Sequence, residues 1–96
     1  MVRLSGSEIQ TVRRVLHEAD PDGRIYLFGS RADDAKKGGD IDLYFESSTA
    51  IFDLKHKLAL EYRLSAECDT KVDLLVKNPG QQDSAIFQIA RRGVPL

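Results

Sequence analysis

The chain is poor in cysteine, lacks tryptophan and has no long apolar run. Cys68 is the only cysteine among 96 residues, so no disulfide can form within the chain and a reducing compartment is expected. No apolar stretch approaches the roughly 18 residues of a membrane span, and no apolar leader segment follows Met1. These features predict a cytoplasmic protein.

An excess of charge of either sign is also missing. The sequence has 14 basic and 15 acidic residues, which gives a net charge of −1. Charge therefore provides no argument for a surface that coats nucleic acid, although a small nucleotide in a local pocket stays compatible with it. The length suffices for one hydrophobic core, so residues 1–96 are expected to form a single domain.

The pattern of apolar and turn residues predicts alternating helices and strands. A capping box, Ser5-x-x-Glu8, marks the start of the first helix. We expect helices over about 6–19, 50–67 and 83–92, strands over 24–28, 40–46 and 71–76, and a short helical turn over 30–35. This order predicts an α/β (α+β) fold, a small mixed β-sheet with helices mainly on one face.

The second of these helices is expected to begin after a cap formed by residues 47–49 and to bury one apolar stripe. Its predicted stripe consists of Ile51, Leu54, Leu58, Tyr62 and Ser65 or Ala66. In the last helix, the apolar residues outnumber what so short a chain can easily bury. Ile86, Phe87 and Ile89 are therefore a candidate surface for a partner or for self-association.

Three aspartates occupy positions where strand residues are expected, although aspartate is depleted from strands. Asp40 and Asp42 alternate with apolar residues and so point to the same face, where they repel each other. A divalent cation resolves this conflict, and ligands that are all oxygen favour Mg²⁺ or Mn²⁺. Asp73, inside the apolar run 72–76, is predicted to join them. The structural alternative is a pair of solvated aspartates on an edge strand.

A glycine and a serine, Gly29-Ser30, follow the first predicted strand directly. Glycine allows a phosphate to approach the backbone, and Ser30 offers a hydroxyl and a helix N-cap whose amides point at an anion. A triphosphate held at this turn would place its inner phosphates over metal ions bound by the aspartates. Lys36 and Lys37 belong to the loop that follows, where a solvated role is the simpler interpretation and contact with phosphate or a partner is the other.

The complete pattern resembles the nucleotidyltransferase superfamily typified by DNA polymerase β. The residues that carry the resemblance are Leu27-Phe28-Gly29-Ser30-Arg31, Gly39-Asp40-Ile41-Asp42-Leu43 and Val72-Asp73-Leu74. The Gly-Ser-Arg variant, the short chain and the closing residues 91–96 are most similar to the minimal nucleotidyltransferases (MNT), such as MntA-like antitoxins. One departure is Gly39, which stands where the family often has a serine.

The resemblance implies a polymerase β-like nucleotidyltransferase core with these site residues. Asp40, Asp42 and Asp73 would be catalytic and would bind two Mg²⁺ (or Mn²⁺) ions, with Asp73 next to the acceptor hydroxyl. Gly29 and Ser30 would hold the phosphates of the substrate ATP, and Arg31 would neutralise phosphate charge or have an exposed structural role.

The resemblance also implies a partner. Minimal nucleotidyltransferases are often paired with a helical protein of the HEPN type, and some act as antitoxins by transferring AMP from ATP to a tyrosine of that toxin. One alternative is a non-catalytic antitoxin that neutralises its partner by contact. A second alternative, an enzyme acting on a small molecule or a nucleic-acid end, is disfavoured because the chain has neither a substrate-holding domain nor a basic surface.

Overall fold

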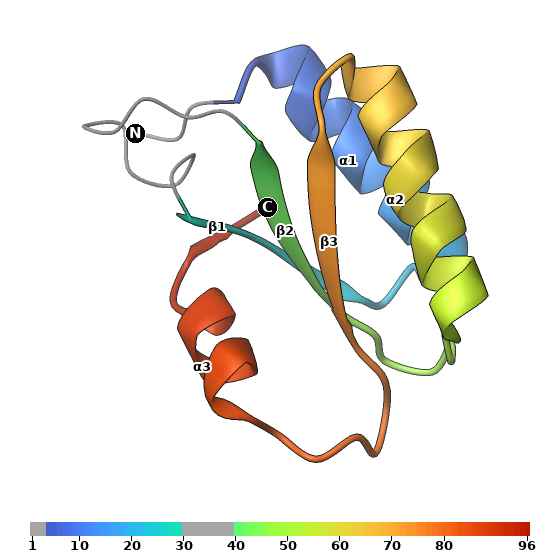
Figure 1. Cartoon of the computed structure of the whole chain (residues 1–96), viewed down its shortest axis with the longest axis vertical. Helices are drawn as coiled ribbons and strands as arrows, with labels where there is room; N and C mark the ends of the chain where they lie inside the picture. Colours follow the sequence, from blue (N-terminus) through green and yellow to red (C-terminus); the bar gives the residue numbers. More distant parts are fainter. Residues whose placement is uncertain (1–3, 30–39) are drawn as a thin grey trace.

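The computed structural model describes residues 4–29 and 40–96 (Figure 1). Its elements follow the predicted order, with most bounds within one or two residues of those expected, except that a short strand that was not predicted follows the last helix. They are α1 (Gly6–Ala19), β1 (Arg24–Phe28), β2 (Ile41–Glu46), α2 (Leu54–Cys68), β3 (Val72–Lys77), α3 (Ala85–Arg91) and β4 (Val94–Pro95). The predicted helical turn from Ser30 to Ala35 and the loop containing Lys36 and Lys37 lie outside the described residues.

The sheet is mixed, as predicted, and β2 lies at its centre. The strand order is β3-β2-β1-β4, where β1 is antiparallel to β2 and to β4, and β2 is parallel to β3. Parallel pairing of β2 with β3 requires a crossover, which α2 provides. The first residues of β2 and β3 therefore meet at one end of the sheet.

Two helices cover one face of the sheet and the third covers part of the other, which agrees with helices lying mainly on one face (Figure 1). The main core lies under α1 and α2 and is formed by Val12, Val15, Leu16, Ile25, Leu27, Ile41, Leu43, Phe45, Leu64, Val72 and Leu74. On the opposite face, α3 packs Phe87 and Ala90 against Tyr44. Phe87 is thus buried, and only Ile86 and Ile89 of the predicted α3 surface are exposed.

The helix α2 begins at Leu54, so the predicted start at residue 50 was wrong. Its N-cap is Asp53, whose carboxylate accepts a hydrogen bond from the His56 amide at 2.8 Å. The segment 47–50 is held as a loop because the buried Asp20 carboxylate binds it. Asp20 accepts hydrogen bonds from the Ser47 hydroxyl at 2.8 Å and from the amides of Ser48 at 2.7 Å and Thr49 at 3.1 Å.

The predicted buried stripe of α2 was also wrong, because Ile51, Leu54, Leu58 and Tyr62 are exposed. The helix instead turns Leu60 and Leu64 towards the core. Its rotation is fixed by hydrogen bonds to the outer edge of β3. Glu61 accepts from the Leu74 amide at 2.7 Å, and Ser65 accepts from the Val72 amide at 2.9 Å. These bonds also cover an edge that another chain could otherwise pair with.

None of the helices in the described part of the chain combines the length and apolar character that crossing a bilayer requires.

Candidate functional site

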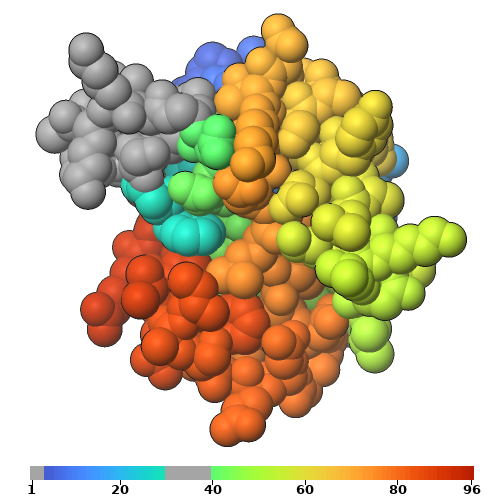
Figure 2. All heavy atoms as spheres, viewed as in Figure 1, coloured from blue at the N-terminus to red at the C-terminus, as the bar shows by residue number. Residues whose placement is uncertain are grey.

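Asp42 and Asp73 lie side by side on neighbouring strands. They are direct partners in the parallel register of β2 and β3, and they share a face with Tyr44 and Leu75, which follow them along the two strands. On that face α3 contacts the later residues of the strands and leaves their beginnings uncovered (Figure 1). Figure 2 shows the start of β2 (green) at the surface beside β3 (orange) and above α3 (red). The predicted convergence of these two aspartates is what the fold produces.

Asp40 directly precedes β2 and joins the pair through a lysine that the sequence analysis did not single out. The Lys71 ammonium lies 3.7 Å from a carboxylate oxygen of Asp40 and 3.9 Å from one of Asp73. The sequence did contain a signal, because Lys71 stands two residues before Asp73 and so falls on the same side of that segment. Lys71 is the positive charge that these two aspartates share.

The electrostatic environment of Asp42 is unfavourable for a carboxylate. Partial burial, together with the negative charges of Asp73 and Asp40, raises the pKa of Asp42 above its ordinary value, and Lys71 only partly opposes this. A site that disfavours its own negative charge is stabilised by a bound cation. The repulsion expected from the sequence is therefore present at Asp42.

The donor chemistry of this face suits a hard divalent cation, since three carboxylates offer oxygen ligands alone. In the arrangement described, however, no three His, Cys, Asp or Glu side chains of residues 4–29 and 40–96 converge on one metal position. Asp40 and Asp73 are instead turned to Lys71. Asp40, Asp42 and Asp73 are the residues that would hold such an ion, once the side chains reorient from Lys71 towards it.

Gly29 ends β1 beside Asp42, whose strand neighbour is Phe28. The φ angle of Gly29 is +74°, a backbone conformation that residues with a Cβ rarely adopt. A Cβ at this position would also overlap the Asp42 carboxylate, with the Cγ atom only 3.1 Å away. The glycine turn is therefore aimed at the aspartates, as predicted. Ser30 and Arg31, the other predicted phosphate ligands, and Gly39 lie outside the described residues.

Tyr44 does not border the site, although it shares a face with Asp42. It is fully buried, and its hydroxyl donates a hydrogen bond to Glu46 at 2.8 Å. Burial and this bond raise the pKa of Tyr44 to about 12. Arg91 of α3 donates hydrogen bonds to Glu46 of β2 at 2.9 Å and to Asp83 at 3.0 Å. Through Glu46, Arg91 anchors α3 to the sheet.

Two cavities, of about 340 and 240 Å³, lie away from the aspartates. The larger is lined by residues that include His17, Arg24 and Leu96, and the smaller lies between the start of α2 and β3. Neither is lined by Asp40, Asp42 or Asp73.

A glycine turn at the end of one strand, an Asp-x-Asp pair beginning the next and a third aspartate on its parallel neighbour define a nucleotidyltransferase core. The family comparison agrees with this class. The chain belongs to the polymerase β nucleotidyltransferase family, whose model, described as "Polymerase beta, Nucleotidyltransferase", matches residues 10–96. The predicted fold and enzyme class are thereby confirmed.

Solved structures with this fold include several toxin–antitoxin complexes. A toxin–antitoxin with AMP-PNP is 26% identical, with a TM-score of 0.62 over 70% of this chain and 55% of that one. The MntA-HepT toxin–antitoxin is 23% identical, with a TM-score of 0.64 over 93% and 68% of the two chains. A tri-AMPylated Shewanella oneidensis HEPN toxin in complex with MNT antitoxin is 23% identical, with a TM-score of 0.58 over 83% and 61%. This chain thus spans 55% of the length of the first of these. No curated protein matched significantly.

Proposed function

We propose that this protein transfers AMP from ATP to a hydroxyl group of a helical, HEPN-type partner and thereby acts as its antitoxin. The observation that carries the proposal is the pairing of Asp42 with Asp73 in adjacent strands, next to Asp40 and the Gly29 turn. The similar structures support the choice of substrate and partner, because one contains AMP-PNP and another an AMPylated HEPN toxin.

The reaction would be a displacement at the α-phosphorus of ATP. The acceptor oxygen forms a bond to this phosphorus, the bond to the bridging oxygen of the β-phosphate breaks, and pyrophosphate leaves. Asp73 would accept the proton of the acceptor hydroxyl and release it to water. Divalent ions, when bound by the aspartates, supply positive charge at the attacking and leaving oxygens. The proposed acceptor is a tyrosine, and the proposed ions are Mg²⁺ or Mn²⁺.

The remaining predicted contacts concern the phosphates. In the proposal, Gly29 and Ser30 hold the β- and γ-phosphates through the backbone and a hydroxyl, and Arg31 neutralises their charge. The side chain of Asp73 is 49% exposed, which would give the acceptor of a protein partner access to it.

Labelled ATP tests the proposal directly. The protein, Mg²⁺ and the candidate toxin are incubated with ATP labelled at the α-phosphate, and transfer to the toxin is measured. We expect wild type to label the toxin, and Asp42→Asn or chelation of the metal to reduce labelling at least about 100-fold. Asp69→Asn is a matched control, because Asp69 lies outside the site in a left-handed conformation (φ 51°) that asparagine tolerates. Equal labelling by wild type and Asp42→Asn would refute an enzymatic role of this site.

A second candidate function is neutralisation by contact alone. The observation that favours it is that Lys71 lies 3.7 Å from Asp40 and 3.9 Å from Asp73, which places a positive charge beside two of the three proposed metal ligands. A double variant, Asp40→Asn/Asp42→Asn, separates the two functions. Loss of toxin neutralisation supports transfer of AMP, and full neutralisation without labelling selects the contact function.

A further inference from the structure

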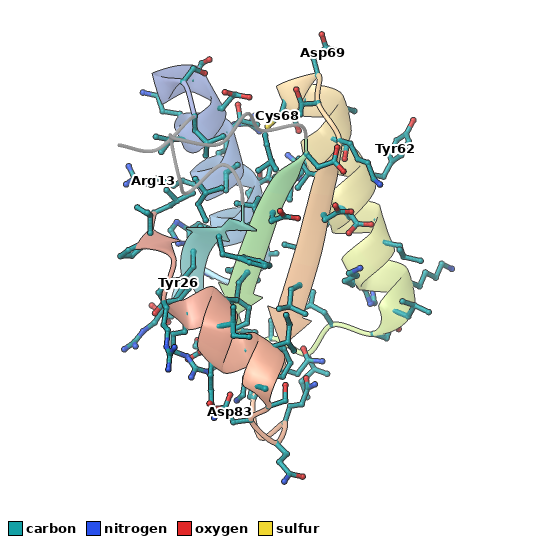
Figure 3. All side chains as sticks on the ribbon, turned by 60° about the vertical axis from the view of Figure 1, so that its left-hand side comes forward. Arg13, Tyr26, Tyr62, Cys68, Asp69 and Asp83 are labelled. Atoms are coloured by element: carbon teal, nitrogen blue, oxygen red, sulfur yellow. The ribbon has the colours of Figure 1, made fainter. Side chains whose placement is uncertain are left out.

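The helix α2 has a second apolar face that the fold leaves in solvent. Leu54, Leu58 and Tyr62 follow one another at four-residue spacing, and Ile51 precedes them. Their exposed fractions are 71%, 47% and 78%, and that of Ile51 is 75%. Figure 3 shows Tyr62 pointing away from the body of the molecule. Exposed apolar residues gathered on one element are typical of a contact surface.

The shape of this face is self-complementary. Residues at four-residue spacing form a ridge along a helix, here Leu54, Leu58, Tyr62 and Ala66. Ala59, a small residue next to Leu58 in the helix, is also exposed. If a copy of α2 crosses in the opposite direction about a two-fold axis near residue 60, Leu58 faces Tyr62 of the copy and Leu54 faces Ala66. Leu54 then meets the small Ala66, and Leu58 and Tyr62 of the two copies pack against each other at the centre.

The charges of α2 favour the same antiparallel arrangement. Lys55 is exposed in the first turn, which holds no acidic residue, and Asp69 is exposed just after the last turn, which holds no basic one. Lys57 and Glu67 are already paired within the chain, Lys57 with Glu61 and Glu67 with Arg14 and Arg63. This order opposes the preference of a helix, whose N-terminus is positive and whose C-terminus is negative. An antiparallel copy places the basic start of each helix beside the acidic end of the other, and it also pairs the two helix dipoles favourably.

We infer that the outer face of α2 is the interface of a homodimer, with Leu58 and Tyr62 at its centre and the two helices antiparallel. One helix pair buries less than the roughly 800 Å² per partner of a standard interface, so the dimer is weak, with a Kd on the order of 100 μM. Because α2 lies on the opposite face of the sheet from α3, the aspartates of both copies stay open to solvent.

Sedimentation velocity over a concentration series up to about 1 mM tests the inference on the protein alone. We expect wild type to dimerise with concentration, and Leu58→Lys and Tyr62→Glu each to weaken the dimer at least about tenfold. Ile89→Lys is the matched control, since Ile89 is equally apolar, 58% exposed and located on α3. Circular dichroism confirms that the variants remain folded, which is expected because all three positions are exposed.

A mixing experiment tests the register. In a mixed dimer of the Leu58→Lys and Tyr62→Glu proteins, one contact pairs the introduced opposite charges and the other is the native Leu58–Tyr62 contact. The mixture is therefore expected to associate more strongly than either variant alone. A wild-type monomer at every concentration, a dimer weakened by Ile89→Lys but not by Leu58→Lys, or no association in the mixture would overturn the inference. Loss of toxin binding by Leu58→Lys from a monomeric wild type would assign the face to the toxin instead and would equally overturn it.

Discussion

Replacing Gly29 by alanine should disturb the site through two separable effects. An L-residue at a positive φ costs about 1–2 kcal/mol, partly offset by about 0.4–1 kcal/mol from the stiffer unfolded chain. The second effect is steric, because the added methyl group overlaps the Asp42 carboxylate. Overpacking of this kind typically costs about 1–3 kcal/mol, unless Asp42 rotates away.

Gly80 provides the matched control for the backbone effect. Its φ is +78°, against +74° at Gly29, and a Cβ there would meet nothing within 4 Å. Gly80→Ala should therefore lower the free energy of unfolding by about 1 kcal/mol, or roughly 4–8 °C in Tm, and leave the site intact. If the Asp42 side chain keeps its place, Gly29→Ala should lower the free energy of unfolding by up to about 3 kcal/mol more than Gly80→Ala does. Otherwise the added methyl group should move the Asp42 side chain out of position.

Thermal melts and Mn²⁺ titrations of the two variants distinguish these outcomes. A displacement of about 1 Å at a metal or reacting group commonly costs on the order of 100-fold, so Gly29→Ala should bind Mn²⁺ far more weakly than Gly80→Ala. If the two variants share the same Tm and the same Mn²⁺ affinity, the packing of Gly29 against Asp42 does not matter and the reasoning is wrong.

Three further substitutions have defined outcomes. Asp20→Ala removes the acceptor of two hydroxyls and several loop amides and should lower the free energy of unfolding in urea by about 3 kcal/mol at pH 7. Those bonds outweigh the effect of burial and hold the pKa of Asp20 well below its ordinary value. Wild type should therefore lose this stability advantage over Asp20→Ala progressively as the pH falls below about 4, and an undiminished difference at pH 2 would contradict the assignment. Lys71→Met should strengthen Mn²⁺ binding about 5–10-fold in calorimetry, since it removes a positive charge next to two ligands, whereas Lys77→Met at the far end of β3 should not. Asp42→Asn should raise Tm slightly at pH 7 without metal, because the raised pKa of Asp42 means that the fold disfavours the ionised carboxylate. The gain in Tm should vanish at acidic pH, where Asp42 is protonated. A lower Tm of Asp42→Asn than of wild type at pH 7 would contradict this.

Local sequence signals were sufficient for most of the fold. The Ser5–Glu8 capping box forms as predicted, with both of its hydrogen bonds, and defines the start of α1. Alternation in β2 correctly placed Asp42 opposite the buried Ile41 and Leu43. The pairing of Asp42 with Asp73 followed from the crossover through α2, which makes the two strands parallel neighbours.

What could not be predicted depends on contacts between distant residues. The helix α2 has two apolar stripes, and periodicity alone cannot tell which one faces the core. The choice is made by Glu61 and Ser65, whose hydrogen bonds to β3 become visible only in the folded chain. Asp20 likewise resembles an ordinary turn residue in Asp20-Pro21-Asp22-Gly23, yet it is buried and binds a loop almost thirty residues away.

In the proposed function, Asp40, Asp42 and Asp73 together bind the divalent ions used in nucleotidyl transfer. Calorimetric titration of Mn²⁺ into the protein, saturated with a non-hydrolysable ATP analogue, measures this without a partner. We expect wild type to bind two ions per chain and Asp42→Asn/Asp73→Asn to weaken binding by about 100-fold or more, whereas Asp69→Asn should leave it unchanged. Equal Mn²⁺ affinity in wild type and the double variant would contradict it.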